Sequence, residues 1–201
     1  MTALHQLFRV FRAAILTVSL LFIGCSTVET QSFRVNQDSA IESAQIAVGA
    51  DFSKYDTLMA EDMGIYFPQN SPATEADLTR IRDIFRTAFL GELEDYRITR
   101  QPGPSTMAVQ ASLIDLRGAA ASQVPALRSD IQDIARSGSL VFLMELKDSQ
   151  SGKVLARAGD SAEAPAIATA AGAQTDWQSV EAAAQKWARL FRGFLDENLG
   201  R

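Results

Sequence analysis

A short apolar run that ends at Cys25 limits where a folded domain can begin in this chain. Residues 13–24 are almost entirely apolar, and the residues before them carry Arg9 and Arg12 but no acid. A basic start, a short apolar middle and a small residue before the cut are typical of a secretory signal. A helix of this run would be about 18 Å long, short of the roughly 30 Å hydrocarbon core of a bilayer. We therefore expect residues 1–24 to be a cleaved signal peptide.

The segment Phe22-Ile23-Gly24-Cys25 resembles the lipobox of bacterial lipoproteins, although Phe22 stands where leucine is usual. The resemblance implies diacylglycerol on the Cys25 sulfur, cleavage before Cys25, and acylation of the new amino group, for example with palmitate. Several acyl chains anchor stably, since each buried CH₂ contributes about 0.8 kcal/mol. Ser26 in place of aspartate implies the outer membrane, with the domain facing the periplasm. A cleaved signal with an incidental cysteine, or an uncleaved anchor, stays open.

Composition excludes several classes of site. The 201 residues contain one cysteine and one histidine, His5, which lies in the expected signal. A mature chain would then have no histidine for a Ser-His-Asp triad or a zinc site, and no second cysteine for a disulfide. It would carry a net charge of about −7, because Arg9 and Arg12 are lost from 19 basic residues set against 24 acidic ones. This charge argues against nucleic acid as a partner.

The mature part divides into a tether and a domain. Residues 25–50 are mixed and polar, and we expect them to be a lipidated tether, with either a weak helix or disorder over 39–48. Residues 51–201 contain enough apolar residues for one packed domain, since 47% of the chain is hydrophobic.

Alternation and helical spacing predict the elements of this domain. A first strand over 55–67 slips in phase near Asp62, which indicates a bulge or a break. Thr74 and Asp77 form the pattern of a capping box for an amphipathic helix over 75–94. Further strands are predicted at 95–100, 105–116, 140–146 and 154–158. Between them we expect an excursion at 117–137 with a short helix at 129–135, and after them a flexible loop at 161–174. The last predicted element is a helix from Trp177 to about Leu199, with Asp176 as its cap and Gly200 as its stop.

These elements predict an α+β fold. We expect one mixed, largely antiparallel sheet of about five strands, with the two long amphipathic helices packed on one face.

The same residues resemble a family of bacterial lipoproteins that carries a domain of unknown function. The blocks that bear the resemblance are Tyr55-Asp56, the helix ending at Glu94, Pro102-Gly103-Pro104, the strand Val109–Leu116, Glu145–Ser149, Ser151–Ala156 and Asp160. It covers about residues 50–200 and implies a fold. It implies no reaction and no catalytic residues.

Motifs that hint at catalysis are weak. The run Asp148–Lys153 lacks the glycine spacing of a phosphate loop and joins two strands, so it predicts a turn. Ser149 or Ser151 beside Lys147 or Lys153 would be an exposed serine–lysine pair, with nothing to depress the lysine pKa.

Charged and aromatic residues suggest two further sites. Glu61, Asp62 and Asp115 are too few and too scattered for a calcium loop, and we expect solvated strand ends. Arg80, Arg82, Arg86, Arg97 and Arg100 are either ordinary surface charge or a dock for an acidic partner. Trp187 lies in the apolar stripe of the last helix, and we expect it in the core. Trp177 lies in the first turn and is the better candidate for a partly exposed contact, although a core position is favoured for it too.

The sequence therefore predicts a non-catalytic binding or accessory module of the cell envelope, held on the membrane through Cys25, with an envelope protein as its partner and no cofactor. Two alternatives remain. One is a carboxylate- or lysine-dependent envelope hydrolase, for which Glu61, Asp115 and Glu145 would have to converge in a cleft. The other is a small-ligand carrier with an apolar cavity.

Overall fold

The computed structural model describes residues 31–36, 41, 43–116, 140–161, 165–168 and 172–201. They belong to a compact unit that runs from Gln31 to Arg201. The predicted signal, Cys25, the excursion at 117–137 and part of the loop at 161–174 lie outside the described residues.

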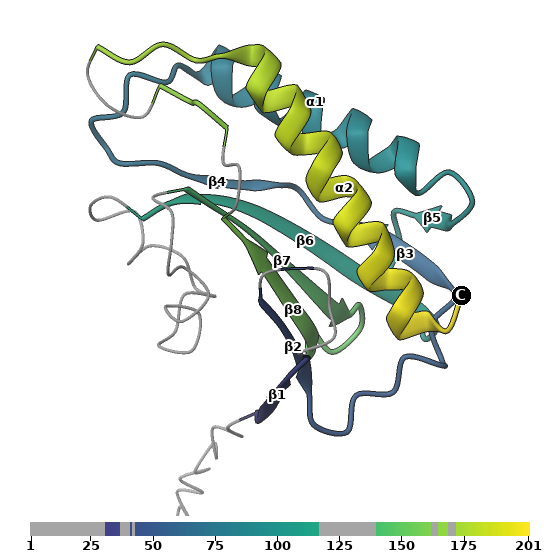
Figure 1. Cartoon of the computed structure of the whole chain (residues 1–201). Coiled ribbons are helices and arrows are strands. Elements are labelled where there is room, and N and C mark those ends of the chain that lie inside the picture. Colours follow the sequence, from purple (N-terminus) through teal and green to yellow (C-terminus); the bar gives the residue numbers. More distant parts are fainter. Residues whose placement is uncertain (1–30, 37–40, 42, 117–139, 162–164, 169–171) are drawn as a thin grey trace, which may run out of the picture. The chain divides into compact units, whose positions relative to one another are not determined.

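The described part of this unit consists of one sheet and two helices (Figure 1). The strands are β1 (Phe33–Val35), β2 (Ser43–Ala47), β3 (Thr57–Ala60), β4 (Gly64–Tyr66), β5 (Arg97–Thr99), β6 (Thr106–Asp115), β7 (Leu140–Asp148) and β8 (Val154–Asp160), and the helices are α1 (Glu75–Glu92) and α2 (Trp177–Leu199). Neither of these helices is both long enough and apolar enough to cross a membrane.

The sheet is mixed. Its described strands follow the order β1-β2-β8-β7-β6-β3-β5, and β4 pairs with β6. Pairing is antiparallel from β1 to β6 and parallel where β6 meets β3 and β4 and where β3 meets β5. The α+β class with a single mixed sheet and two helices is confirmed. The expected number of about five strands is wrong, because this sheet has eight.

The first two of the additional strands come from the expected tether. β1 and β2 pair with each other, and β2 pairs with β8 from Ser43 opposite Gly159 to Ile46 opposite Ala156. The weak helix expected over 39–48 is therefore wrong. Ala44 is fully buried and Ile46 is 8% exposed, because alternate residues of β2 face the core. The compact unit begins at Gln31, within the segment expected to be the tether.

The third additional strand comes from a bulge. Ala60 pairs with Val109 and Gly64 pairs with Ser112, so residues 61–63 face a shorter stretch of β6. The Glu61 N–H donates to the Val109 carbonyl at 2.9 Å. This extra residue splits the predicted strand 55–67 into β3 and β4 and confirms the phase slip near Asp62.

Both helices begin where their capping residues predict, and α2 also ends at its predicted stop, whereas α1 ends at Glu92 and not at residue 94. The Thr74 hydroxyl accepts from the Asp77 N–H, and the Asp77 carboxylate accepts from the Thr74 N–H, which completes the capping box of α1. Asp176 caps α2, and Gly200 ends it with φ of 68°. A left-handed conformation at this position favours glycine.

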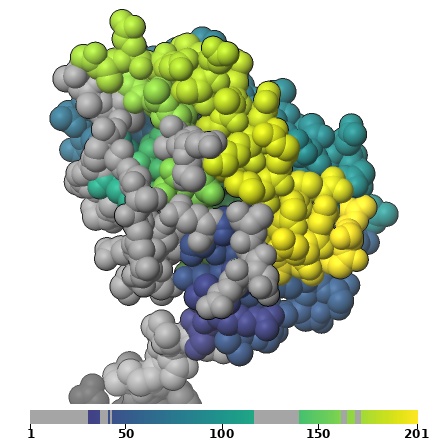
Figure 2. Space-filling view, viewed as in Figure 1, coloured from purple at the N-terminus to yellow at the C-terminus, as the bar shows by residue number. Residues whose placement is uncertain are grey.

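The core forms where the two helices meet the sheet. The Phe142 ring of β7 lies 5.6 Å from the ring of Phe85 in α1 and 4.8 Å from that of Trp187 in α2. Both helices therefore pack on one face, as predicted, and Figure 2 shows them side by side. Trp187 is 1% exposed, which confirms it as a core residue.

A fragment that begins at Asp51 should be less stable than one that begins at Gln31. It lacks β1 and β2, leaves β8 as an open edge, and loses the buried side chains of Ile41 and Ile46. We expect its free energy of unfolding to fall by at least about 3 kcal/mol. Urea denaturation of 31–201 and 51–201 measures this, and equal midpoints would contradict the assignment of residues 31–50 to the domain.

Candidate functional site

An apolar groove lies between α1 and the strands at the β5 edge of the sheet. Its volume is about 520 Å³. We name it the edge groove. Its apolar lining comes from α1, α2 and strands β3 and β6 and is made by Leu58, Phe85, Phe89, Val109, Ala111 and Phe191. Its outer wall includes Leu90 and Ile98, which are 46% and 41% exposed.

Three of the five arginines singled out in the sequence line this groove. They are Arg82, Arg86 and Arg100. The Arg82 Nε donates to the Met63 carbonyl at 3.3 Å, which places it beside the bulge. Neither Arg82 nor Arg100 makes an ion pair with a carboxylate of the described residues. Arg86 lies 3.6 Å from Asp83, with both side chains exposed.

The other two arginines have separate contacts. The Arg80 guanidinium lies 4.0 Å from the centre of the Trp177 ring. Arg97 lies 3.5 Å from Asp56. The basic group therefore divides. Trp177, in the first turn of α2, is partly buried and contacts Arg80 of α1, whereas the sequence favoured a core position for it.

Acidic side chains also line the groove. They are Glu61 and Asp62, which belong to the bulge. The Glu61 carboxylate lies 3.5 Å from the Lys147 ammonium, which offsets its charge. Asp62 is exposed. The basic groups thus outnumber the acidic ones at this end of the groove.

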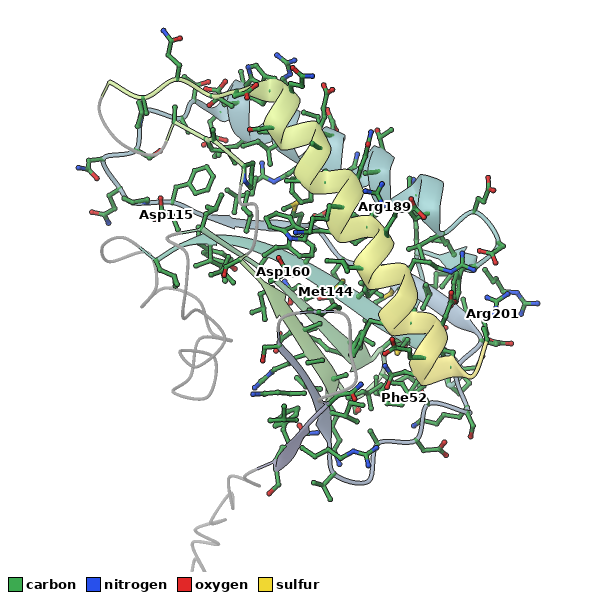
Figure 3. The ribbon with its side chains drawn as sticks, viewed as in Figure 1. Phe52, Asp115, Met144, Asp160, Arg189 and Arg201 are labelled. Carbon is green, nitrogen blue, oxygen red and sulfur yellow. The ribbon has the colours of Figure 1, made fainter. Side chains whose placement is uncertain are left out.

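The three carboxylates of the hydrolase alternative do not all converge. Glu61 and Glu145 lie 3.5 Å and 3.6 Å from the same Lys147 ammonium, whereas Asp115 lies apart from them. Asp115 pairs with Leu140 and Glu145 pairs with Gln110. Because Phe142 faces the helices, Leu140 and Asp115 share that face, whereas Glu145 points to the opposite face. Asp115 is fully buried, so the expected solvated strand end is wrong there. Figure 3 places Asp115 at one end of the sheet, away from Arg201 at the other.

Glu145 belongs instead to a row of polar side chains on the face away from the helices. Its carboxylate accepts from the Arg157 Nε at 2.8 Å and lies 3.6 Å from the Lys147 ammonium. Lys147 also donates to Gln110. Glu145 and Arg157 are 7% and 9% exposed. Such a pair is satisfied by its partners, which gives it a structural role across β6, β7 and β8.

Metal ligands do not cluster in the described part. It contains no group of three or more His, Cys, Asp or Glu side chains that could hold an ion. Glu61, Asp62 and Asp115 in particular do not meet.

One buried polar contact on the helix face has no signal in the sequence. The Trp187 Nε1 donates to Asp160 at 3.1 Å, with both residues buried. In the sequence, Asp160 stands out only as one of the residues that bear the family resemblance, two residues beyond the predicted strand 154–158. It lies opposite Phe142 in the β7–β8 ladder and so is directed under α2.

The run Asp148–Lys153 is a turn, as predicted. The Asp148 carboxylate accepts from the Ser151 N–H and hydroxyl, both at 2.8 Å, and from the Tyr55 hydroxyl at 2.8 Å. Ser149 donates its hydroxyl to the Gly103 carbonyl. The serines of the serine–lysine hypothesis are therefore hydrogen-bonded within or beside the turn and are not directed at a lysine. Their hydrogen bonds hold the β7–β8 hairpin.

Replacing Asp148 with asparagine should lower stability in a pH-dependent way. Hydrogen bonds from the Ser151 N–H, the Ser151 hydroxyl and the Tyr55 hydroxyl hold the pKa of Asp148 well below its ordinary value. A lowered folded-state pKa stabilises above the unfolded value near 4, and the contribution is lost as pH falls further. We expect D148N to cost about 1–3 kcal/mol at pH 7 and less at pH 3. Urea denaturation at both pH values measures this, with exposed Glu94→Gln as the control, and a pH-independent cost would contradict it.

Comparisons with solved structures give distant similarities. A PelC dodecamer from Paraburkholderia phytofirmans matches with 13% identity over 82% of this chain and 97% of that chain, with a TM-score of 0.34. A point variant of that dodecamer matches with 14% identity over 83% and 98%, with a TM-score of 0.36. Likeness at these scores carries no argument about this chain. No curated protein matches it.

A family model gives a firmer result. The model of DUF3313, described as a protein of unknown function, matches residues 38–191. This range includes both helices in whole or in large part and every described strand from β2 onward. The expected domain of unknown function is confirmed, and since the match spans more than half of the sequence, the chain belongs to the DUF3313 family.

Proposed function

We propose that this protein is a bacterial envelope lipoprotein whose domain acts as a non-catalytic binding or accessory module. The observation that carries the anchor is Cys25, placed directly after a short apolar run with a basic start. Acyl chains on Cys25 would hold the domain at the membrane. Residues 26–30 would then be the tether, because the compact unit begins at Gln31.

The binding role is supported by the edge groove. It is concave and apolar with a few polar groups at one end, which is the usual composition of a ligand site. Its volume of about 520 Å³ lies within the range of such sites. The two candidate occupants of the groove are an envelope protein partner and a small ligand.

A hydrolase is the weaker alternative. Asp115 and Glu145 lie on opposite faces of the sheet. Glu61 and Glu145 are near each other, but both are engaged by Lys147, and Glu145 also by Arg157. A general acid or base must reach the reacting group, so this set would have to rearrange before it could act.

Replacing Cys25 with serine should block acylation and processing. The serine hydroxyl lacks the thiolate nucleophilicity that thioether formation with diacylglycerol uses. We expect Cys25→Ser to accumulate as the uncleaved precursor, without incorporation of an alkyne-labelled palmitate. Ser26→Ala keeps the cysteine and is the matched control. Normal cleavage of Cys25→Ser, seen by intact-mass measurement, would contradict the lipoprotein proposal.

Residue 26 should decide which membrane holds the protein. We propose the outer membrane, because serine follows the cysteine and the resemblance associates aspartate there with retention in the inner membrane. Ser26→Asp should therefore move the mature protein to the inner-membrane fraction, with acylation unchanged. Separation of the two membranes on a density gradient measures this. An unchanged distribution of Ser26→Asp would contradict the proposed role of this position.

A further inference from the structure

The edge groove has a charged end and an apolar end. Arg82 lies beside the bulge through its hydrogen bond to Met63. β5 pairs Thr99 with Met59, so Arg100 follows at the same level as the bulge. Leu93 lies at the other end of the helix, where α1 stops. A helix rises about 16 Å between Arg82 and Leu93. This distance is the approximate length of the groove from its basic end to its apolar end.

The apolar part is a hollow and not a protrusion. The accessible floor is formed by the partly buried side chains of Phe89, Val109 and Ala111. Leu90 and Ile98 form the wall and are less than half exposed. A bilayer surface binds side chains that project into it. A concave surface of this kind instead fits a single apolar chain that enters it.

The charge at the other end favours an anion. Arg82 and Arg100 have no described carboxylate partner, and Glu61 is offset by Lys147. Asp62 and the Arg86–Asp83 pair complete the charged groups at this end. This local excess of positive charge lies on a chain with a net charge of −5, so it is not a property of the whole surface.

An added peptide strand fits the site less well. β5 is the edge strand, and it has only three residues. Exposed Arg97 begins it, and Pro102 follows shortly after its end. Short edge strands with charge and nearby proline are typical of edges that resist pairing.

We propose that the edge groove binds a single acyl chain with an anionic head group, the tail against Phe89, Val109 and Ala111 and the head group beside Arg82 and Arg100. This rests on the proposed binding role and not on the anchor at Cys25. The ligand class is a fatty acid or another single-chain anionic amphiphile.

A photoreactive dodecanoate tests this on the full chain in its own membranes. The probe carries a diazirine near the end of its tail, and labelled peptides are mapped by mass spectrometry. We expect labels on the α1 segment around Leu90 and on β5 around Ile98. A probe of equal length with a quaternary ammonium head group should label these segments less, because its charge opposes the arginines.

Two variants separate head group from tail. Arg82→Gln with Arg100→Gln should lower dodecanoate labelling by about three- to tenfold, the effect of two partly exposed charge contacts. Leu90→Asp with Ile98→Asp should abolish labelling by either probe. Both pairs replace residues outside the deep core, so the fold should persist. Val48→Asp, on the exposed residue after β2, is the matched control and should label like the unchanged chain.

The outcomes distinguish this inference from the anchor proposal. Equal labelling by the cationic and anionic probes, or labels confined to other segments, would overturn it even if Cys25 is processed normally. A protein partner crosslinked through a photoreactive residue at Leu90, in place of the probe, would also overturn it. Groove labelling that persists in Cys25→Ser would support it independently of the lipid anchor.

Discussion

The contact of Phe142 with both helices determines how this domain is assembled. Its ring meets Phe85 and Phe89 of α1 and Trp187 of α2, all within 5.6 Å between ring centres. Aromatic pairs of this kind contribute about 0.5–1.5 kcal/mol each beyond their buried area. The indole N–H of Trp187 is satisfied by Asp160, on the strand next to Phe142. The bulky ring is therefore buried without leaving a polar atom unpaired.

The edge groove follows from how α1 is connected. β3 and β5 are parallel neighbours, and parallel neighbours need a crossover, which here is α1. The helix is thus held over the β5 edge of the sheet. That edge is narrow, because β5 has three residues and the bulge interrupts the strand beside it. The helix has too little sheet beneath it to be fully packed, and the space that remains is the groove.

The face of the sheet away from the helices carries paired charges that help to fix the strand register. Glu145 pairs with Arg157 across β7 and β8 and with Lys147 along β7. A shift of one residue would bring these charges to the apolar helix face, so their pairing helps to fix the register. Removing one partner would leave a buried charge, which costs more than the pair contributes. These contacts give the charged residues near the centre of the sheet a structural role.

Patterns of neighbouring residues in the sequence determined several elements of this fold. The limits of α2, the capping box at Thr74, the β7–β8 hairpin and the slip near Asp62 depend on neighbouring residues, and the sequence predicted each of them. The tertiary structure alone decided that Ser43–Ala47 joins the sheet, because this short segment becomes a strand only when β8 offers a partner. It also decided that Asp115 and Glu145 lie on opposite faces, and that three of five similar arginines gather at one groove. These outcomes depend on strand register and helix placement between residues far apart in the chain, which periodicity along the sequence does not encode.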